Sequence, residues 1–149
     1  MAMEVTPEQL RAGLRAWAHG SRTTEAAVEL LIRHQRAIHA RAPWLNVTED
    51  GVCSIDVDAL RWHSGAWSGG EQRVVRIACS LLGGDPVRLD DDISALGRPE
   101  MDLVLAALSH AAGADQSVDI RLDEDGRPHL HVLDLGPMHP WPEHTEGQS

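Results

Sequence analysis

The chain contains no lysine, no phenylalanine and no tyrosine among its 149 residues. Without lysine it cannot form a Schiff base, use a lysine as general base or build the lysine-containing loop that binds nucleotide phosphates. Tyrosine-based catalysis is excluded in the same way. Its only large aromatic side chains are five tryptophans. The chain therefore lacks the several exposed aromatic side chains on which RNA-recognition and oligonucleotide-binding folds stack bases. These absences remove several classes of enzyme and of nucleic-acid-binding protein.

Positive charge is scarce, because 13 arginines face 23 carboxylates and the formal net charge is −10. A surface of that sign repels a phosphate backbone, which disfavours nucleic-acid binding. The charge is also uneven: residues 1–41 carry six arginines and four carboxylates, whereas residues 42–149 carry seven arginines and nineteen carboxylates. We therefore expect a protein partner that recognises this asymmetry.

Cysteine is rare, and no long apolar run is present. Cys53 and Cys79 do not have the spacing of a zinc site, and we expect both to be buried free thiols. No segment resembles a signal peptide, and none approaches the 18 apolar residues of a membrane span. The sequence therefore predicts a cytoplasmic protein that does not enter a membrane.

Four helices are predicted from caps and apolar periodicity. Thr6-Pro7-Glu8-Gln9 is a capping box that begins the first helix, and Gly20 ends it. The second helix is expected over Thr24–Ala40, where apolar residues recur at helical spacing. The third begins at Ser68 and ends at Gly83-Gly84, and the fourth runs from Pro99 to Gly113.

Two hairpins are predicted from turn signals. Glu49-Asp50-Gly51 lies between residues 44–47 and 52–57, and Asp125-Gly126 lies between residues 118–122 and 130–135. The fold class is therefore α+β, with four helices packed on two β-hairpins in the order α-α-β-β-α-α-β-β. We expect one domain over residues 1–135 and a tail over residues 136–149, in which Trp141 is the one residue suited to docking on the body or on a partner.

The run Ser68-Gly69-Gly70-Glu71 resembles the signature of ATP-binding cassette proteins, and Val87-Arg88-Leu89-Asp90-Asp91 resembles a degraded Walker B strand. The resemblance implies that the serine and the glycine amides at a helix N-terminus hold the γ-phosphate of a nucleotide bound by another subunit. The chain has no glycine-rich loop, no lysine and no glutamate directly after Asp90, so we expect that it cannot hydrolyse ATP by itself. The same residues also read as a capping box in front of a buried helix.

A similar Ser-Gly-Gly-Glu run followed by Arg-Ile-Ala is found in a family of uncharacterised small actinobacterial proteins, which this chain resembles over its central third. That resemblance brings no activity with it. It supports the interpretation of residues 68–78 as a core helix of the family.

Metal and catalytic sites are weakly indicated. His129 and His131 share one face of a strand, which across the hairpin should present Asp119, Arg121 or Asp123. A third ligand would have to come from His139 or His144 in the tail, and solvent-exposed His–Asp pairs are commoner than metal sites, so we predict no metal and no cofactor. Residues 90–92 are three aspartates that suit a helix start. No nucleophile elbow is present, and His63 near Ser68 in a loop is no dyad, so we predict no catalytic residue.

The sequence thus favours a non-enzymatic protein-interaction or regulatory protein, of the immunity, antitoxin or accessory type. The candidate partner-binding residues are Arg11, Arg15, Arg33, Arg36 and Trp141. The alternative is a nucleotide or phosphate binder that uses the start of the third helix, in trans with a partner. The candidate phosphate-binding residues are Ser68, Gly69, Gly70 and Arg73.

Overall fold

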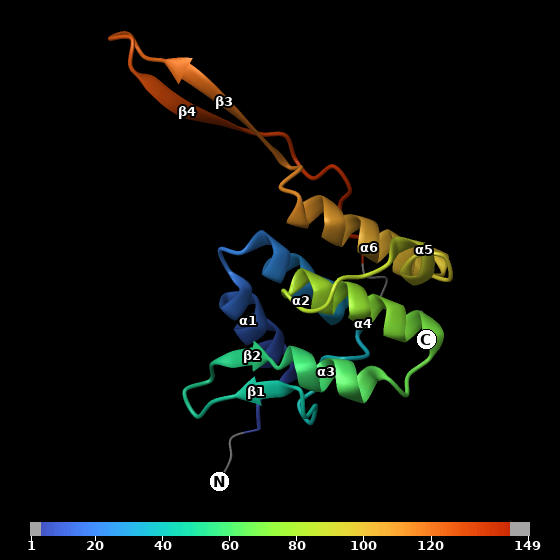
Figure 1. Cartoon of the computed structure of the whole chain (residues 1–149). Helices are drawn as coiled ribbons and strands as arrows, with labels where there is room; N and C mark the ends of the chain where they lie inside the picture. Colours follow the sequence, from blue (N-terminus) through green and yellow to red (C-terminus); the bar gives the residue numbers. More distant parts are fainter. Residues whose placement is uncertain (1–3, 144–149) are drawn as a thin grey trace.

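Helix α2 (Arg22–His34) is the centre of the helical body in the computed structural model, which describes residues 4–143. It packs against α1, α4 and α6, and α4 also packs against α3 and α5 (Figure 1). The other helices are α1 Pro7–Ala18, α3 Val57–Ser64, α4 Gly69–Leu81, α5 Leu89–Asp92 and α6 Arg98–Ala111. The strands are β1 Leu45–Val47, β2 Cys53–Ile55, β3 Gln116–Leu122 and β4 Pro128–Asp134.

The predicted α+β class and the single domain are confirmed, but the expected number of helices is wrong. The described residues form six helices and not four. The additional ones are α3 and the single-turn α5. Asp56 begins α3, since its Oδ1 accepts the amide hydrogen of Ala59 at 3.1 Å. The strand expected over residues 52–57 is therefore too long, because β2 ends at Ile55 and Asp56 is the N-cap of α3.

The second predicted helix is also too long, because α2 ends at His34 and not at Ala40. Gln35 adopts a left-handed conformation with φ of 72°, and the chain then turns back on itself. This turn lets Ala37 and Trp44 enter the core, where the indole Nε1 donates a hydrogen bond of 2.7 Å to the carbonyl of Ala37. Packing of a buried tryptophan overrides the helical periodicity of residues 35–40.

The core lies between α1, α2, α4 and α6 and is built from aliphatic residues and alanine. On α4 the expected buried stripe is confirmed at Val74, Ile77 and Ala78, whereas Leu81 and Leu82 at its end are only partly buried against the core. Both cysteines are free and buried, as expected. Burial raises the pKa of the Cys53 thiol, and it raises the pKa of Cys79 to about 11.

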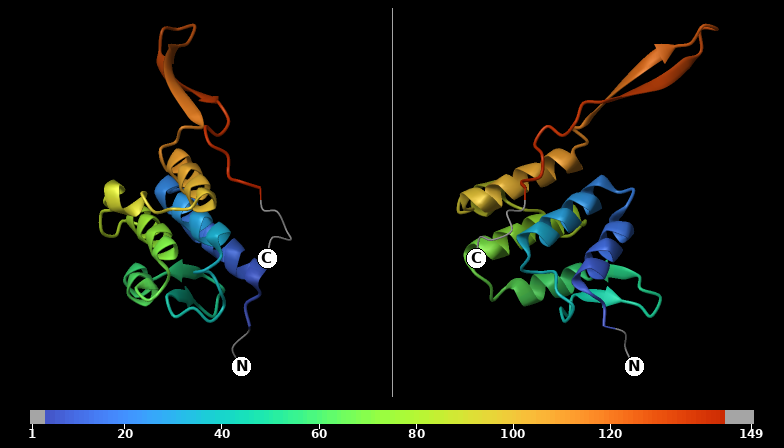
Figure 2. Two further views of the ribbon diagram at one scale, coloured as in Figure 1. Left: turned by 90° about the vertical axis from the view of Figure 1, so that its right-hand side faces the viewer. Right: turned by 180° about the vertical axis from the view of Figure 1, so that it is seen from behind.

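The two hairpins differ in their surroundings. The β1–β2 hairpin packs on α1. The β3–β4 hairpin, residues 116–134, which we call the arm, projects away from the helical body (Figures 1 and 2). Within residues 4–143 the only extensive contacts of β3 and β4 are with each other. The expectation that helices pack on both hairpins is therefore wrong for the arm, which has solvent on both faces.

Across residues 4–143, no helix combines the length and the apolar character that crossing a membrane requires.

Candidate functional site

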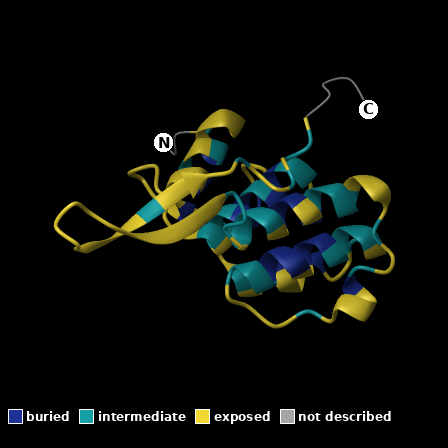
Figure 3. Cartoon of the chain, turned by 90° about the horizontal axis from the view of Figure 1, so that it is seen from above, coloured by how far each residue is buried: buried dark blue, intermediate teal, exposed yellow. Residues whose placement is uncertain are grey.

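The arm carries a continuous aliphatic face. Its two strands pair so that Val118 lies opposite Val132 and Ile120 lies opposite Leu130. Ile120 is 73% exposed and Leu130 is 70% exposed, and Figure 3 shows nearly the whole arm as exposed surface. The exposed aliphatic residues of this face are Val118, Ile120, Leu122, Leu130 and Val132. Each of the five is more than half exposed, and contiguous apolar patches of this kind on soluble proteins often mark interaction sites.

The opposite face of the arm is polar and titratable. Asp119 lies opposite His131, and Arg121 lies opposite His129. This register confirms the predicted placement of the two imidazoles across from an aspartate and an arginine. No group of three or more metal-ligating side chains occurs in the part of the chain that the structure describes. His144 lies outside the described residues.

The ends of the arm are held by local hydrogen bonds. At the tip, the Asp123 carboxylate accepts amide hydrogens from Asp125 and Arg127, and Gly126 takes a positive φ of 79° in the predicted turn. At the base, the amide of Leu135 donates to the carbonyl of Asp115 at 2.8 Å, and the Asp115 side chain accepts from Arg22 of α2 at 2.8 Å. Among the described residues, the hydrogen bonds that tie the arm to the body lie at its base.

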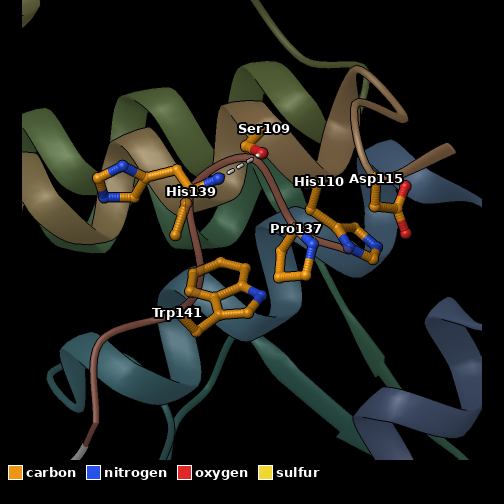
Figure 4. Close-up of a pocket in the computed structure, with 7 residues that line it drawn as sticks. Ser109, His110, Asp115, Pro137, His139 and Trp141 are labelled. Atoms are coloured by element: carbon orange, nitrogen blue, oxygen red, sulfur yellow. Dashed lines mark hydrogen bonds between the residues drawn. The ribbon is translucent and has the colours of Figure 1, made fainter. Parts of the chain in front are cut away.

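After the arm, residues 136–143 return to the helical body. The His139 amide donates to Ser109 Oγ at 3.2 Å (Figure 4). The ring Nε2 of His139 lies 2.6 Å from a carboxylate oxygen of Asp102. Trp141 is half-buried against the core. Its ring lies under the guanidinium of Arg33 at 5.1 Å. The predicted partner-binding tryptophan thus contacts its own chain in this structure, while residues 144–149 are not described.

A small cavity remains where this segment meets α6 (Figure 4). It is lined in part by Ser109, His110 and Asp115. His110 Nε2 lies 2.9 Å from a carboxylate oxygen of Glu25, which lowers the pKa of that carboxyl, and Asp115 is paired with Arg22. Ser109 accepts the His139 amide. These polar groups form hydrogen bonds that hold neighbouring segments of the chain together. No nucleophile is paired with a base among them.

The predicted arginine surface is largely occupied by ion pairs within the chain. Arg15 of α1 and Arg33 of α2 both contact the Glu29 carboxylate. Burial raises the pKa of Glu29, but the two arginine hydrogen bonds outweigh it and hold the pKa below its ordinary value. Arg36 pairs with Glu71 at 3.0 Å and stacks on Trp67 at 4.8 Å. Arg11 is half-buried on α1.

The predicted phosphate-binding residues form a capping box at the start of α4. Ser68 Oγ accepts the Glu71 amide, and the Glu71 carboxylate accepts the amide and the hydroxyl of Ser68, the latter at 2.8 Å. The hydrogen bond from Ser68 lowers the pKa of Glu71. Arg73 donates from Nε to the carbonyl of Asp91 at 2.9 Å, and its guanidinium lies close to Gly69. The Glu71 carboxylate therefore engages the Ser68 amide and hydroxyl and places a negative charge at the start of α4, which disfavours a phosphate there.

The three aspartates of α5 are part of the same region. Asp92 is buried, and its carboxylate accepts hydrogen bonds from Arg76 at 3.0 Å and from the Arg88 amide at 3.1 Å. Arg88 pairs in turn with Asp90. The segment is held to α4 by these contacts, which gives Asp92 a structural role.

Comparison with protein-family models, with curated proteins and with solved structures found no match. The resemblances to the cassette signature and to small actinobacterial proteins stay predictions.

The aliphatic face of the arm was missed as a candidate site, although its signal is present in the sequence. Alternation of Val118, Ile120 and Leu122, and of Leu130 and Val132, predicts one apolar face on each strand. Such alternation ordinarily means that the face packs on a core. Only the position of the arm outside the helical body makes this face available for binding.

Proposed function

We propose that this protein is a non-enzymatic protein-interaction protein and that the arm is its recognition element. The observation that carries the proposal is the aliphatic face of residues 118–132, exposed on a hairpin that has no extensive contact with the helices. An isolated two-stranded hairpin is marginally stable in water, and further strands on its edges stabilise it. The arm is therefore suited to pair with an extended segment of another polypeptide.

The occupant that fits is a strand with apolar side chains on one face and charged side chains on the other. Backbone hydrogen bonds along the arm's free edge would supply affinity, and alternating side chains would supply specificity. A regulatory role as an immunity, antitoxin or accessory protein would use a surface of this kind. Where the partner is a different protein, the chain's net charge of −10 favours basic surroundings over acidic ones.

The test compares the proteins captured from native lysate by three forms of the chain. In the first variant, Ile120→Thr with Leu130→Thr, threonine keeps the strand propensity but removes apolar surface. The matched control is Val52→Thr, because Val52 is 57% exposed but lies outside the arm. We expect the arm variant to lose partners that the wild type and the control retain. Equal recovery by all three forms would refute the proposal.

The alternative function, a nucleotide or phosphate binder at Ser68, has weaker support. The amides of Ser68 and Glu71 are taken by the capping box, and Arg36 is paired with Glu71. The capping box and the buried face of α4 therefore explain Ser68 and Glu71 without a bound phosphate. A thermal-shift measurement with ATP and phosphate separates the two functions.

A further inference from the structure

We propose, resting on the function proposed above, that a partner of the arm is a second copy of this chain. The two copies would pair β3 with β3 in antiparallel fashion across a two-fold axis at Ile120. The product is a four-stranded sheet in the order β4–β3–β3–β4. Three independent features of the arm agree on this arrangement.

The first feature is the direction of the backbone groups of β3. The Asp123 amide donates to the carbonyl of Arg127, and the Leu135 amide donates to the carbonyl of Asp115. Both pairs continue the β3–β4 pairing, one beyond each end of the strands. In an antiparallel pair, hydrogen-bonded and non-hydrogen-bonded positions alternate. The odd-numbered residues of β3 therefore bond to β4, and the even-numbered ones direct their N–H and C=O groups to the open edge. Ile120 lies at the centre of that edge.

The second feature is the side-chain pattern. Opposed residues in an antiparallel pair lie on the same face. With the axis at Ile120, that residue meets its own copy, and Val118 meets Leu122 of the second copy. The two aliphatic faces then become one continuous face across the dimer. All of these are even-numbered positions, so they coincide with the free backbone groups.

The third feature is charge. In the same register Asp119 lies opposite Arg121 of the second copy, and the symmetry repeats this pair. These are non-hydrogen-bonded positions, at which side chains approach most closely. Two oppositely charged pairs thus flank the axis on the polar face.

Shifted registers of β3 are less complementary, and an axis at Val118 would place Ile120 opposite Gln116. An axis at Asp119 or at Arg121 would oppose identical charges at the centre of the interface. An axis at Leu122 would place Asp119 opposite Asp125 and Ile120 opposite Glu124. Like charges directly opposite each other on neighbouring strands are destabilising.

The edge of β4 is a poorer candidate. Its first residue, Pro128, has no amide hydrogen to donate. An axis at His131 would place that histidine against its own copy and His129 against Leu133. No pair of opposite charges would form.

The lengths of the arms also fit. A seven-residue strand is roughly 24 Å long. With the axis at Ile120, Glu124 near the tip of one arm faces Gln116 at the base of the other. Each tip then ends where the other arm leaves its body, and the two helical bodies lie at opposite ends of the sheet.

The net charge of −10 on each chain opposes association, but at an ionic strength of about 0.15 M charges more than about 8 Å apart are largely screened.

Cysteine cross-linking tests the position of the axis. Both native cysteines are buried, so a thiol introduced on the arm is the reactive one. In the Ile120→Cys variant the two thiols face each other across the axis, at a Cα separation near 5.5 Å that permits a disulfide. The matched control is Leu130→Cys, which has almost the same exposure and lies opposite Ile120 on β4. In the dimer its two copies are about 14 Å apart.

We expect mild oxidation to link Ile120→Cys into a dimer and to leave Leu130→Cys largely monomeric. Equal cross-linking of both variants, or of neither, would overturn the assigned register.

Charge exchange tests the pairing in solution by analytical ultracentrifugation. Asp119→Arg alone and Arg121→Asp alone each create two like-charged pairs in the dimer, and we expect the dissociation constant to rise about tenfold or more. A one-to-one mixture of the two variants restores opposite charges at both pairs. Recovery of dimer in the mixture supports the proposal, and a mixture no tighter than its components contradicts it.

Failure of this inference can be told apart from failure of the proposed function. If the wild-type chain stays monomeric and Ile120→Cys does not cross-link, while Ile120→Thr with Leu130→Thr still abolishes capture of other proteins, then only the self-pairing is wrong. If capture is also unaffected by that double variant, the arm is not a recognition element and both proposals fail.

Discussion

Gly13 of α1 lies directly against Cys53 of β2, so closely that a Cβ on the glycine would be 2.5 Å from the Cys53 sulfur and 3.2 Å from its Cβ. Glycine in a helix interior is normally unfavourable by about 1 kcal/mol relative to alanine. Here the unfavourable helix propensity of glycine is offset because its lack of a side chain lets α1 pack directly on β2 of the first hairpin. The approach gives the first prediction.

Gly13→Ala should destabilise the protein by about 1–3 kcal/mol, because the new methyl group forces β2 away from α1. Gly70→Ala in the first turn of α4 is the matched control. A Cβ there meets no atom within 4 Å, so helix propensity should make the protein more stable by a few tenths to about 1 kcal/mol. Urea unfolding of both variants measures the difference, and equal effects of the two substitutions would contradict the packing argument.

The start of α4 gives the second prediction. Ser68→Ala removes the acceptor for the Glu71 amide and should reduce the free energy of unfolding by about 1 kcal/mol. Millimolar ATP or phosphate should leave the thermal midpoint of the wild type unchanged. A ligand at a hundred times its dissociation constant would stabilise by about 2.7 kcal/mol, so a clear upward shift that Ser68→Ala abolishes would favour the phosphate-binding alternative.

The third prediction concerns pH. Burial lowers the pKa of His34, although the charges of Glu100 and Glu71 partly oppose this. The folded protein therefore resists protonation of His34, and stability is fully present above about pH 6.5, the pKa of an unfolded histidine. It should be lost progressively as the pH falls from there towards the lower folded pKa.

His34→Gln should flatten this part of the stability profile, measured as the urea midpoint at several pH values from 7.5 down to about 3.5. The lowered pKa values of Glu25, Glu29 and Glu71 predict a further loss below about pH 4.5, which the variant should retain. A profile of the variant that follows the wild type above pH 5 would show that His34 is not responsible.

The fourth prediction concerns the returning segment, residues 136–143. Trp141→Ala removes the ring that packs on the core and stacks with Arg33. We expect faster amide hydrogen exchange at His139, whose amide is bonded to Ser109, and a loss of about 1–3 kcal/mol of stability. Trp62→Ala is the control, because Trp62 is 80% exposed and should change stability by no more than about 0.5 kcal/mol.

The fifth prediction concerns the two thiols. Cys53 and Cys79 are buried, and burial raises the pKa of both, that of Cys79 to about 11. Because the thiolate is the reactive form, a water-soluble thiol reagent at pH 8 should label neither residue in the folded protein. Both should react once the chain is unfolded in denaturant. Rapid labelling of the native protein would place a cysteine on the surface.

Local features of the sequence predicted much of the fold because their causes are local. The capping boxes at Thr6 and Ser68 and the turn at Asp125-Gly126 depend on residues within about four positions of each other, and each has its predicted form. The missing helix α3 had a local signal too, the N-cap Asp56, which a strand interpretation concealed.

The candidate site was predicted less well because it depends on distant contacts. Arg33 looks like a solvent-facing residue of α2 in the sequence, but it is engaged by Glu29, by Trp141 and by the carbonyl of Pro142. The end of α2 at Gln35 depends on the indole of Trp44 bonding back to Ala37. No window of neighbouring residues contains this information.

By itself the sequence determined the chemistry that this protein lacks, the α+β class and the strand alternation that gives the arm one aliphatic face. Only the tertiary structure decided that no helix of residues 4–143 packs over this face, that most of the candidate arginines are paired within the chain, and that the Ser68 amide is satisfied by Glu71. The physical reason is that composition and short-range periodicity specify which surfaces are apolar, whereas the long-range packing of the helical body decides which of them remain in contact with water.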